Sequence, residues 1–206
     1  MSRLPKLNFP AIRLRARRRG DGVEVWDSLR GIYLVLTPEE WVRQHLIAYL
    51  TAYCGVQPKR IVQEYAVALN GQPQRADVVV VGDRAEPLLL AECKAPCIPI
   101  NGRTLAQAVR YNSVLGARYV ILTNGLRHYC CECRDGEYVQ LGGFPDLSGD
   151  CPSVFPGRFP PQPFPQPFPQ PFPRPFSLYS AVLISARPDR YKFRKFLSIY
   201  PWKASL

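Results

Sequence analysis

Two carboxylates and a lysine, placed where two apolar segments begin or end, are the side chains of this chain best suited to chemistry. Asp77 opens one apolar segment, and Glu92 and Lys94 close another. Successive residues of a β-strand point to opposite faces, so Glu92 and Lys94 share a face, with Cα atoms about 6 to 7 Å apart. The turn-forming residues between the segments, 82–87, predict that the two segments lie side by side and that Asp77 lies next to Glu92.

These residue types indicate a divalent-metal site. Mg²⁺ prefers oxygen ligands and keeps several waters, so two carboxylates and a backbone carbonyl suit it, and Lys94 would orient or deprotonate one of the waters. The alternative explanation is structural: Glu92 and Lys94 form an ion pair, and Asp77 pairs with an arginine. We favour the metal site because an acid at the end of the apolar segment 88–91 needs a cation to offset its desolvation, and because the three residues occur together.

Four short motifs follow one another along the chain: Arg75-Ala76-Asp77, Glu92-Cys93-Lys94-Ala95-Pro96, Gln107-Ala108-Val109-Arg110-Tyr111-Asn112 and Leu122-Thr123-Asn124-Gly125. Their order resembles the PD-(D/E)XK nuclease superfamily and, more closely, the N-terminal nuclease domain of type I restriction enzyme restriction subunits in its short stand-alone bacterial form. The segment 36–45 is similar to the opening helix of that family. The resemblance covers about residues 9–146, and the Gln-x-x-x-Tyr motif makes it more specific than the acidic motif alone.

The resemblance implies roles for five residues. Asp77, Glu92 and Lys94 would be catalytic, with the two carboxylates holding Mg²⁺, or Mn²⁺ in its place. Gln107 and Tyr111 would bind the substrate, on a helix beside the site and in contact with the substrate phosphate or the catalytic lysine. A helix with a polar edge explains Gln107 and Tyr111 equally well. The implied reaction is hydrolysis of DNA phosphodiester bonds that leaves a 5′-phosphate end.

Glu40 is a third candidate metal ligand, since relatives in the superfamily supply an acid from the first helix. Its place three residues after Thr37 offers a second explanation, a capping box at the helix start. Glu64 is another candidate for the additional acid. His45 and His128 are the only histidines, and neither has a motif around it, which disfavours a histidine-dependent nuclease or a zinc hydrolase.

The chain is strongly basic, with a formal charge of +11 from 27 Lys and Arg against 16 Asp and Glu. This charge favours a polyanionic partner such as DNA, and a membrane surface is the alternative partner. Arginines at positions 13, 15 and 17 alternate with apolar residues, which fits DNA contact and a solvated strand face equally well. No apolar stretch approaches the roughly 20 residues that span a bilayer, and the N-terminus lacks a secretory signal, so we expect a cytoplasmic protein without membrane contact.

The seven cysteines are expected to be reduced thiols, mostly in strands. A metal site built from Cys130, Cys131, Cys133 and Cys151 is disfavoured. Paired C-x-x-C spacing is missing, and two adjacent strand residues face opposite ways.

The apolar patterns predict two helices. Thr37 as N-cap and Pro38 in the first turn predict a helix that runs to about residue 53. A second helix, from 104 to about 115, would place Gln107 and Tyr111 one turn apart on the same face. The predicted strands are 11–19, 23–26, 32–36, 60–69, 76–81, 88–94, 118–122, 127–134 and 137–141.

This order of elements predicts an α/β fold with a restriction-endonuclease-like core, in which a central mixed β-sheet is flanked by helices. We expect a nuclease-like domain at 1–146, opened by a β-hairpin, and a low-complexity tail at 147–206. Residues 161–176 repeat Pro-Gln-Pro-Phe three times and then Pro-Arg-Pro-Phe, which predicts polyproline II or disorder and no helix or sheet. We favour a spacer over a partner-binding tail.

The sequence therefore predicts a Mg²⁺-dependent deoxyribonuclease, with endonuclease as the favoured mode. The alternative is a catalytically weak module that keeps the nuclease fold and binds nucleic acid or a protein partner. The presence of all three of Asp77, Glu92 and Lys94 favours the enzyme. DNA against RNA, the cutting mode, sequence specificity, the tail's partner and the oligomeric state, including a homodimer, stay open.

Overall fold

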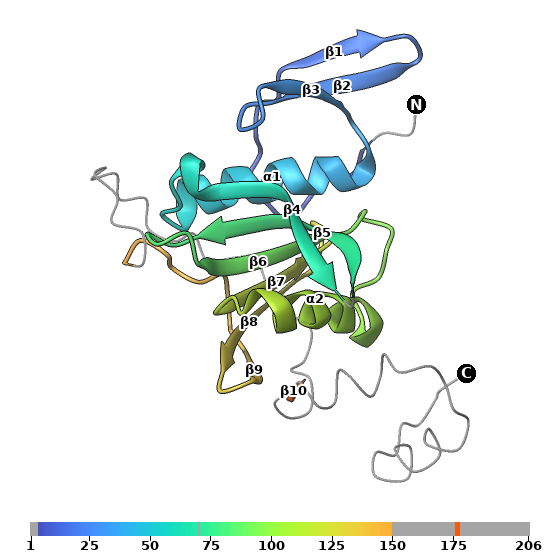
Figure 1. The fold of residues 1–206 in the computed structure, drawn as a ribbon. Helices are drawn as coiled ribbons and strands as arrows, with labels where there is room; N and C mark the ends of the chain where they lie inside the picture. Colours follow the sequence, from blue (N-terminus) through green and yellow to red (C-terminus); the bar gives the residue numbers. More distant parts are fainter. Residues whose placement is uncertain (1–3, 70, 150–175, 178–206) are drawn as a thin grey trace, which may run out of the picture.

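Two β-sheets and two helices form the described fold (Figure 1). The computed structural model of the 206-residue chain describes residues 4–69, 71–149 and 176–177. The helices are α1 (Pro38–Tyr53) and α2 (Gly102–Leu115), and a short 3₁₀ turn lies at Pro58–Arg60. The strands are β1 (Ala16–Arg19), β2 (Gly22–Asp27), β3 (Ile32–Val35), β4 (Ile61–Leu69), β5 (Gln72–Val81), β6 (Pro87–Cys93), β7 (Tyr119–Thr123), β8 (His128–Arg134), β9 (Glu137–Gln140) and β10 (Phe176–Ser177).

The larger sheet is mixed, which confirms the predicted α/β fold. Its strand order is β10-β9-β8-β7-β6-β5-β4. Strands β6 and β7 are parallel, whereas the other described neighbours pair antiparallel. Parallel neighbours need a long crossover, and the segment that contains α2 provides it.

One helix covers each face of this sheet (Figure 1). On one face, Leu46 and Leu50 of α1 share a core with Val78 of β5. On the other face, Val109 of α2 shares a core with Val120 of β7. A strand that is covered on both faces has apolar residues at consecutive positions, because both sets of side chains are buried. This explains the apolar sequences of β5 and β6.

Helix α1 begins as predicted. The Thr37 Oγ1 accepts a hydrogen bond from the Glu40 N–H at 3.0 Å, and Pro38 occupies the first turn. The capping-box explanation for Glu40 is wrong, however. The Thr37 N–H donates to the Val35 carbonyl at 2.9 Å, and the Glu40 carboxylate is engaged by Arg43 instead.

Strands β1, β2 and β3 form a separate antiparallel sheet beyond α1 (Figure 1). The predicted N-terminal hairpin is confirmed, although its first strand begins at Ala16 and not at residue 11. Val25 is fully buried on the side of this sheet that faces the body of the protein. Asp27 anchors the same side, since its carboxylate accepts hydrogen bonds from Gln44 at 3.3 Å and from Gln63 at 2.7 Å.

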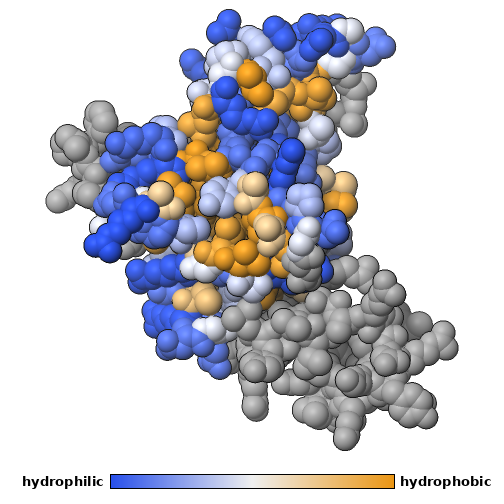
Figure 2. Space-filling model, in the orientation of Figure 1, coloured by the Kyte–Doolittle hydropathy of each residue, from blue (hydrophilic) through white to orange (hydrophobic). Residues whose placement is uncertain are grey.

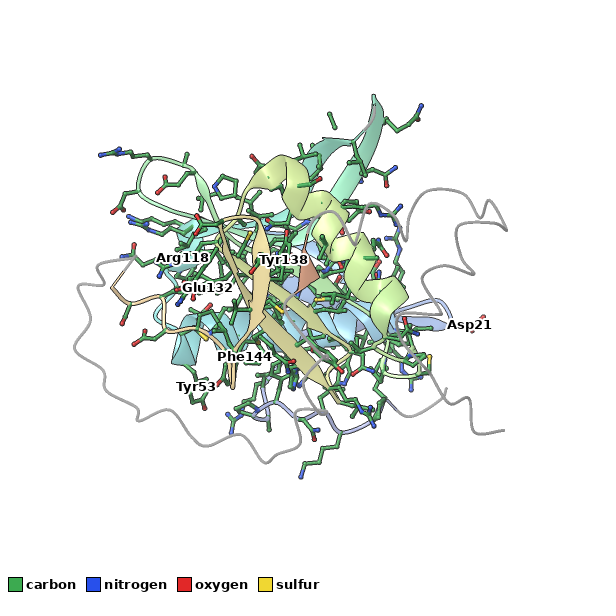
Figure 3. All side chains as sticks on the ribbon, turned by 90° about the horizontal axis from the view of Figure 1, so that it is seen from below. Asp21, Tyr53, Arg118, Glu132, Tyr138 and Phe144 are labelled. Carbon is green, nitrogen blue, oxygen red and sulfur yellow. The ribbon has the colours of Figure 1, made fainter. Side chains whose placement is uncertain are left out.

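The end of α2 is fixed by the buried side chain of Asn112. Its amide accepts from the Ala117 N–H at 2.8 Å and donates to the Ala117 carbonyl at 3.0 Å and the Tyr138 hydroxyl at 3.1 Å. The hydrogen bond to Tyr138, which is labelled in Figure 3, ties α2 to β9. Next to β7, the Arg118 Nε forms an ion pair of 2.9 Å with Glu132 of β8.

The described fold extends past the predicted boundary at residue 146. Leu147 is fully buried, and its N–H donates to the Cys54 carbonyl at 3.0 Å. Phe176, the last residue of the proline repeat, and Ser177 pair with β9, contrary to the expectation that the repeat forms no strand. The rest of the predicted tail lies outside the described residues. Neither described helix has the length and apolar character needed to cross a membrane.

Candidate active site

The site is built where β5 and β6 run side by side below the start of α1. Val78 of β5 pairs with Ala91 of β6, so the next residues along, Asp77 and Glu92, are neighbours across the two strands. The Cys93 N–H donates to the Asp77 Oδ2 at 2.7 Å, which takes the place of a regular ladder contact and fixes the aspartate. The structure thus brings together the two carboxylates that the sequence singled out.

Glu92 uses its two carboxylate oxygens differently. Its Oε1 accepts hydrogen bonds from the Lys94 Nζ at 2.7 Å and from the Gln107 Nε2 at 3.0 Å. Its Oε2 is buried and accepts no hydrogen bond from any residue that the structure describes. The residue is only 3% exposed, so this unsatisfied oxygen would cost about 1 to 3 kcal/mol if nothing else compensated it.

Helix α2 supplies the remaining predicted residues. Gln107 and Tyr111 lie one turn apart on the face that meets the sheet, and the Gln107 Nε2 donates to the Tyr111 hydroxyl at 3.2 Å. The Tyr111 hydroxyl donates in turn to the Gln74 Oε1 at 3.4 Å. Gln107 therefore contacts Glu92 itself rather than Lys94, and Tyr111 lies behind it.

Strand β5 is irregular at Asp77. Ala76 packs in the core on the α2 face, whereas Val78 packs on the α1 face, although residues two apart in a regular strand share a face. Opposite Asp77, Glu64 of β4 has φ +52°, a left-handed conformation that is unusual for a residue with a Cβ. Such local departures from the ladder redirect a side chain. Here the redirected side chain is Asp77.

The two additional candidate acids, Glu40 and Glu64, are both ion-paired with Arg43 of α1. The Arg43 guanidinium also approaches the Asp77 Oδ1 to 3.9 Å. Glu40 is also held by the Gln44 Nε2 at 2.8 Å. The Glu40 carboxylate is thus satisfied by α1 itself, and the structure does not place it as a metal ligand. Glu64 is likewise committed to Arg43.

The sequence reasoning missed two residues, Arg43 and Glu39. Glu39 is half-buried at the start of α1, and its charge acts on Asp77, Glu92 and Lys94 alike. Adjacent helix residues point about 100° apart, so only one of Glu39 and Glu40 can face the site. The two adjacent acids were a usable signal, but the resemblance to the superfamily pointed to Glu40 alone.

Burial dominates the electrostatics of the pair. It raises the pKa of Glu92 to about 7, with a further rise from the Asp77 charge and an opposing effect of Lys94. Burial also raises the pKa of Asp77 to about 6, although the Cys93 N–H and nearby cations lower it. For Lys94, burial acts to lower the pKa, but the Glu92 charge and hydrogen bond outweigh it and raise it. Lys94 therefore stays protonated near neutral pH.

The donor set fits a hard divalent cation in part. Two carboxylates, one with a buried oxygen that lacks a described partner, are the ligand type that Mg²⁺ uses. Among the described residues, no three His, Cys, Asp or Glu side chains are arranged to hold a metal ion, so the remaining coordination would come from water and substrate. The six described cysteines are free thiols.

Comparisons with known proteins identify the family of the chain. Residues 38–145 match the family described as type I restriction enzyme R protein N terminus. Among solved structures, the chain is similar to a fragment from Vibrio vulnificus YJ016 attributed to an HsdR subunit of a type I restriction enzyme, with 25% identity and a TM-score of 0.41. That match covers 56% of this chain and 26% of the other chain. No curated protein matches. The family match spans more than half of the 206 residues, and the chain therefore belongs to the family of type I restriction enzyme R protein N termini.

Proposed function

We propose that this domain is a Mg²⁺-dependent nuclease of the PD-(D/E)XK type that hydrolyses phosphodiester bonds of DNA. The observation that carries the proposal is the unequal hydrogen bonding of the two carboxylate oxygens of Glu92. One of its oxygens is held by Lys94 and Gln107, and the other is buried beside Asp77 with no hydrogen bond from a described residue. A purely structural ion pair would leave no reason to bury that second oxygen.

Each residue has a distinct part in the proposed reaction. Asp77 and Glu92 would hold the cation, with Mn²⁺ as a substitute for Mg²⁺. When bound, the cation supplies positive charge to the phosphodiester and makes a water more acidic. Gln107 orients Glu92 through its 3.0 Å hydrogen bond, and the Cys93 N–H orients Asp77.

Lys94 acts in this proposal as a charged hydrogen-bond donor. Its raised pKa keeps the proton on Nζ, so it would stabilise negative charge that develops on the phosphate and position the attacking water. The role of general base, which the sequence left open for Lys94, is disfavoured by the same direction of shift.

The second candidate function is a nucleic-acid-binding module that keeps the fold but cleaves weakly. One observation favours it: the Arg43 guanidinium lies 3.9 Å from the Asp77 Oδ1, where its positive charge competes with a metal ion for the same carboxylate. A charge of this kind would weaken metal binding.

Cleavage assays separate the two candidates. The full chain is incubated with supercoiled plasmid and with single-stranded DNA in Mg²⁺, in Mn²⁺ and in EDTA. We expect metal-dependent cleavage by the wild type, loss of at least a hundredfold in Lys94→Ala, and wild-type rates in Lys59→Ala, which removes an exposed lysine. Equal rates in the wild type and Lys94→Ala would overturn the nuclease proposal.

A further inference from the structure

The outer face of the small sheet gathers arginines around two aromatic rings. The strand register places Arg15 opposite Trp26 and Arg17 opposite Glu24, and Trp26 pairs with Tyr33. Since alternate strand residues share a face, three arginines and two aromatic rings lie with Glu24 and Val35 on the side away from the buried Val25. We call these arginines and rings the arginine face: Arg15, Arg17, Arg19, Trp26 and Tyr33.

The guanidinium groups of this face are held in place by the rings. The Arg17 Cζ lies 3.8 Å from the centre of the Tyr33 ring, and the Arg15 Cζ lies 5.6 Å from the Trp26 ring and 5.8 Å from the Tyr33 ring. Trp26 and Tyr33 contact each other edge to face at 5.1 Å. Cation–π contacts of this kind restrict an arginine without neutralising it.

One carboxylate offsets part of the charge. Glu24 accepts from the Arg17 Nε at 2.7 Å and from the Arg19 Nη1 at 3.0 Å. Arg15 forms no ion pair with any described residue, so three arginines face one glutamate. Asp21 lies in the turn at the far end of the sheet (Figure 3).

The core does not require these arginines. All four residues of β1 are exposed, and β1 is an edge strand with one neighbour. Figure 2 shows hydrophilic residues over the outer end of this sheet. Charged residues on an edge strand often have no role other than to prevent edge-to-edge pairing with another chain. That role does not require three arginines on one face with aromatic rings beneath them.

We propose that the arginine face binds the phosphate backbone of duplex DNA, apart from the candidate active site. This inference rests on the proposed function, because it assigns a docking surface to the same substrate. The rings are covered by guanidinium groups and are not free to stack on bases, so the partner's phosphates are contacted and not its bases. Arg15 to Arg19 span about 14 Å, which matches the rise of roughly four base pairs along the duplex axis.

The test measures DNA binding in EDTA, so that cleavage plays no part. A fluorescein-labelled duplex is titrated with the full chain over a series of salt concentrations. The variant replaces Arg15, Arg17, Arg19 and Glu24 by Gln, so no buried carboxylate loses its partners. Its charge falls by two, and the matched control is Lys59→Gln with Arg84→Gln, two exposed residues with the same change in charge.

We expect the slope of log affinity against log salt to become shallower by about 2 to 3 in the four-residue variant and to stay at the wild-type value in the control. Arg15→Gln alone, which breaks no ion pair among the described residues, should lower the slope by about 1. Wild-type slopes in both variants would overturn the proposal. Binding of the same proteins to phosphatidylserine vesicles is measured in parallel. If the four-residue variant lost vesicle binding but kept wild-type DNA binding, the proposal would be overturned in favour of a membrane surface.

The DNA-binding test of the arginine face and the cleavage test of the nuclease proposal can fail independently. A shallower slope together with no metal-dependent cleavage would leave the arginine face as a DNA surface and refute the nuclease. Metal-dependent cleavage together with unchanged slopes would retain the nuclease and refute the arginine face.

Discussion

Glu92→Gln should stabilise the metal-free protein at pH 8, although it removes one partner of an ion pair. Burial raises the pKa of the Glu92 carboxyl from 4.5 to about 7, and this rise corresponds to a cost of about 3 kcal/mol for keeping the carboxylate charged above pH 7. Gln keeps an oxygen for Lys94 and carries no charge. We expect a net gain of about 1 to 3 kcal/mol, because the Lys94 hydrogen bond weakens when its acceptor is neutral.

The sign of the pH dependence follows from the direction of the shift. The folded-state pKa of Glu92 lies above its unfolded value, so the stability that this group contributes is full below about pH 4.5 and is lost as the pH rises to about 7. The advantage of Glu92→Gln should therefore be small at pH 5 and complete at pH 8.

Thermal unfolding in EDTA at both pH values measures this difference, with about 2 to 4 °C expected per kcal/mol for a chain of this size. Glu137→Gln, at an exposed position, is the matched control and should show no difference. Added Mg²⁺ should stabilise the wild type and not Glu92→Gln. A variant less stable than the wild type at pH 8 would show that Glu92 serves as a structural partner of Lys94, and the reasoning would fail.

Three other changes test contacts that stabilise the fold, one of them beside the site. Arg43→Met should lower the free energy of unfolding by about 3 to 5 kcal/mol in denaturant titrations, because it leaves the buried Glu40 carboxylate and the partly exposed Glu64 carboxylate without their cation; a loss below about 1 kcal/mol would mean that the ion pairs are weak. Asn112→Ala should cost about 1 to 3 kcal/mol through unsatisfied backbone groups, with Ser113→Ala as the exposed control, and equal stability of the two variants would argue against the helix-end role. A chain truncated after residue 149 loses only the two-residue strand β10 of the described fold and should stay close to the wild-type unfolding midpoint, whereas truncation after 146 should lower the midpoint because it also removes the buried Leu147.

The fold could be predicted well because the apolar pattern is strong. Helix α1, helix α2 and the strands from β4 to β9 lie within a few residues of the predicted ranges. Among these elements the largest difference is in β5, which begins at Gln72 rather than residue 76. Residues 72–75 are polar and exposed, so hydrophobic periodicity could not detect them, and only the pairing with β4 reveals them.

Some residues of the sequence motifs lie in the candidate site, and others only stabilise helix ends and turns. Asn112, which follows Tyr111 in its motif, fixes the end of α2 and lies away from the acids. Asn124 accepts hydrogen bonds from two backbone N–H groups of the turn after β7, at 3.0 and 2.8 Å. Gly125 has φ +80°, and a Cβ there would lie 2.7 Å from Leu7. Spacing alone does not separate these roles.

The detailed geometry of the site lay beyond sequence reasoning for a physical reason. The sequence places Asp77 next to Glu92 through the turn between their strands, but it gives no sign of the left-handed Glu64 or of the irregularity in β5 that redirects Asp77. Arg43 was invisible as a site residue because its three acidic neighbours come from α1, β4 and β5. Long-range pairings of this kind depend on the packing of a helix on a sheet.

Mn²⁺ binding tests the central claim, that Asp77 and Glu92 hold a divalent cation, most directly. Free Mn²⁺ is measured by electron paramagnetic resonance while the full-length wild type, Asp77→Asn, Glu92→Gln and the control Glu137→Gln are titrated at pH 8. We expect binding to the wild type and the control, and a loss of at least tenfold in affinity in both site variants. Equal Mn²⁺ affinity in all four proteins would contradict it.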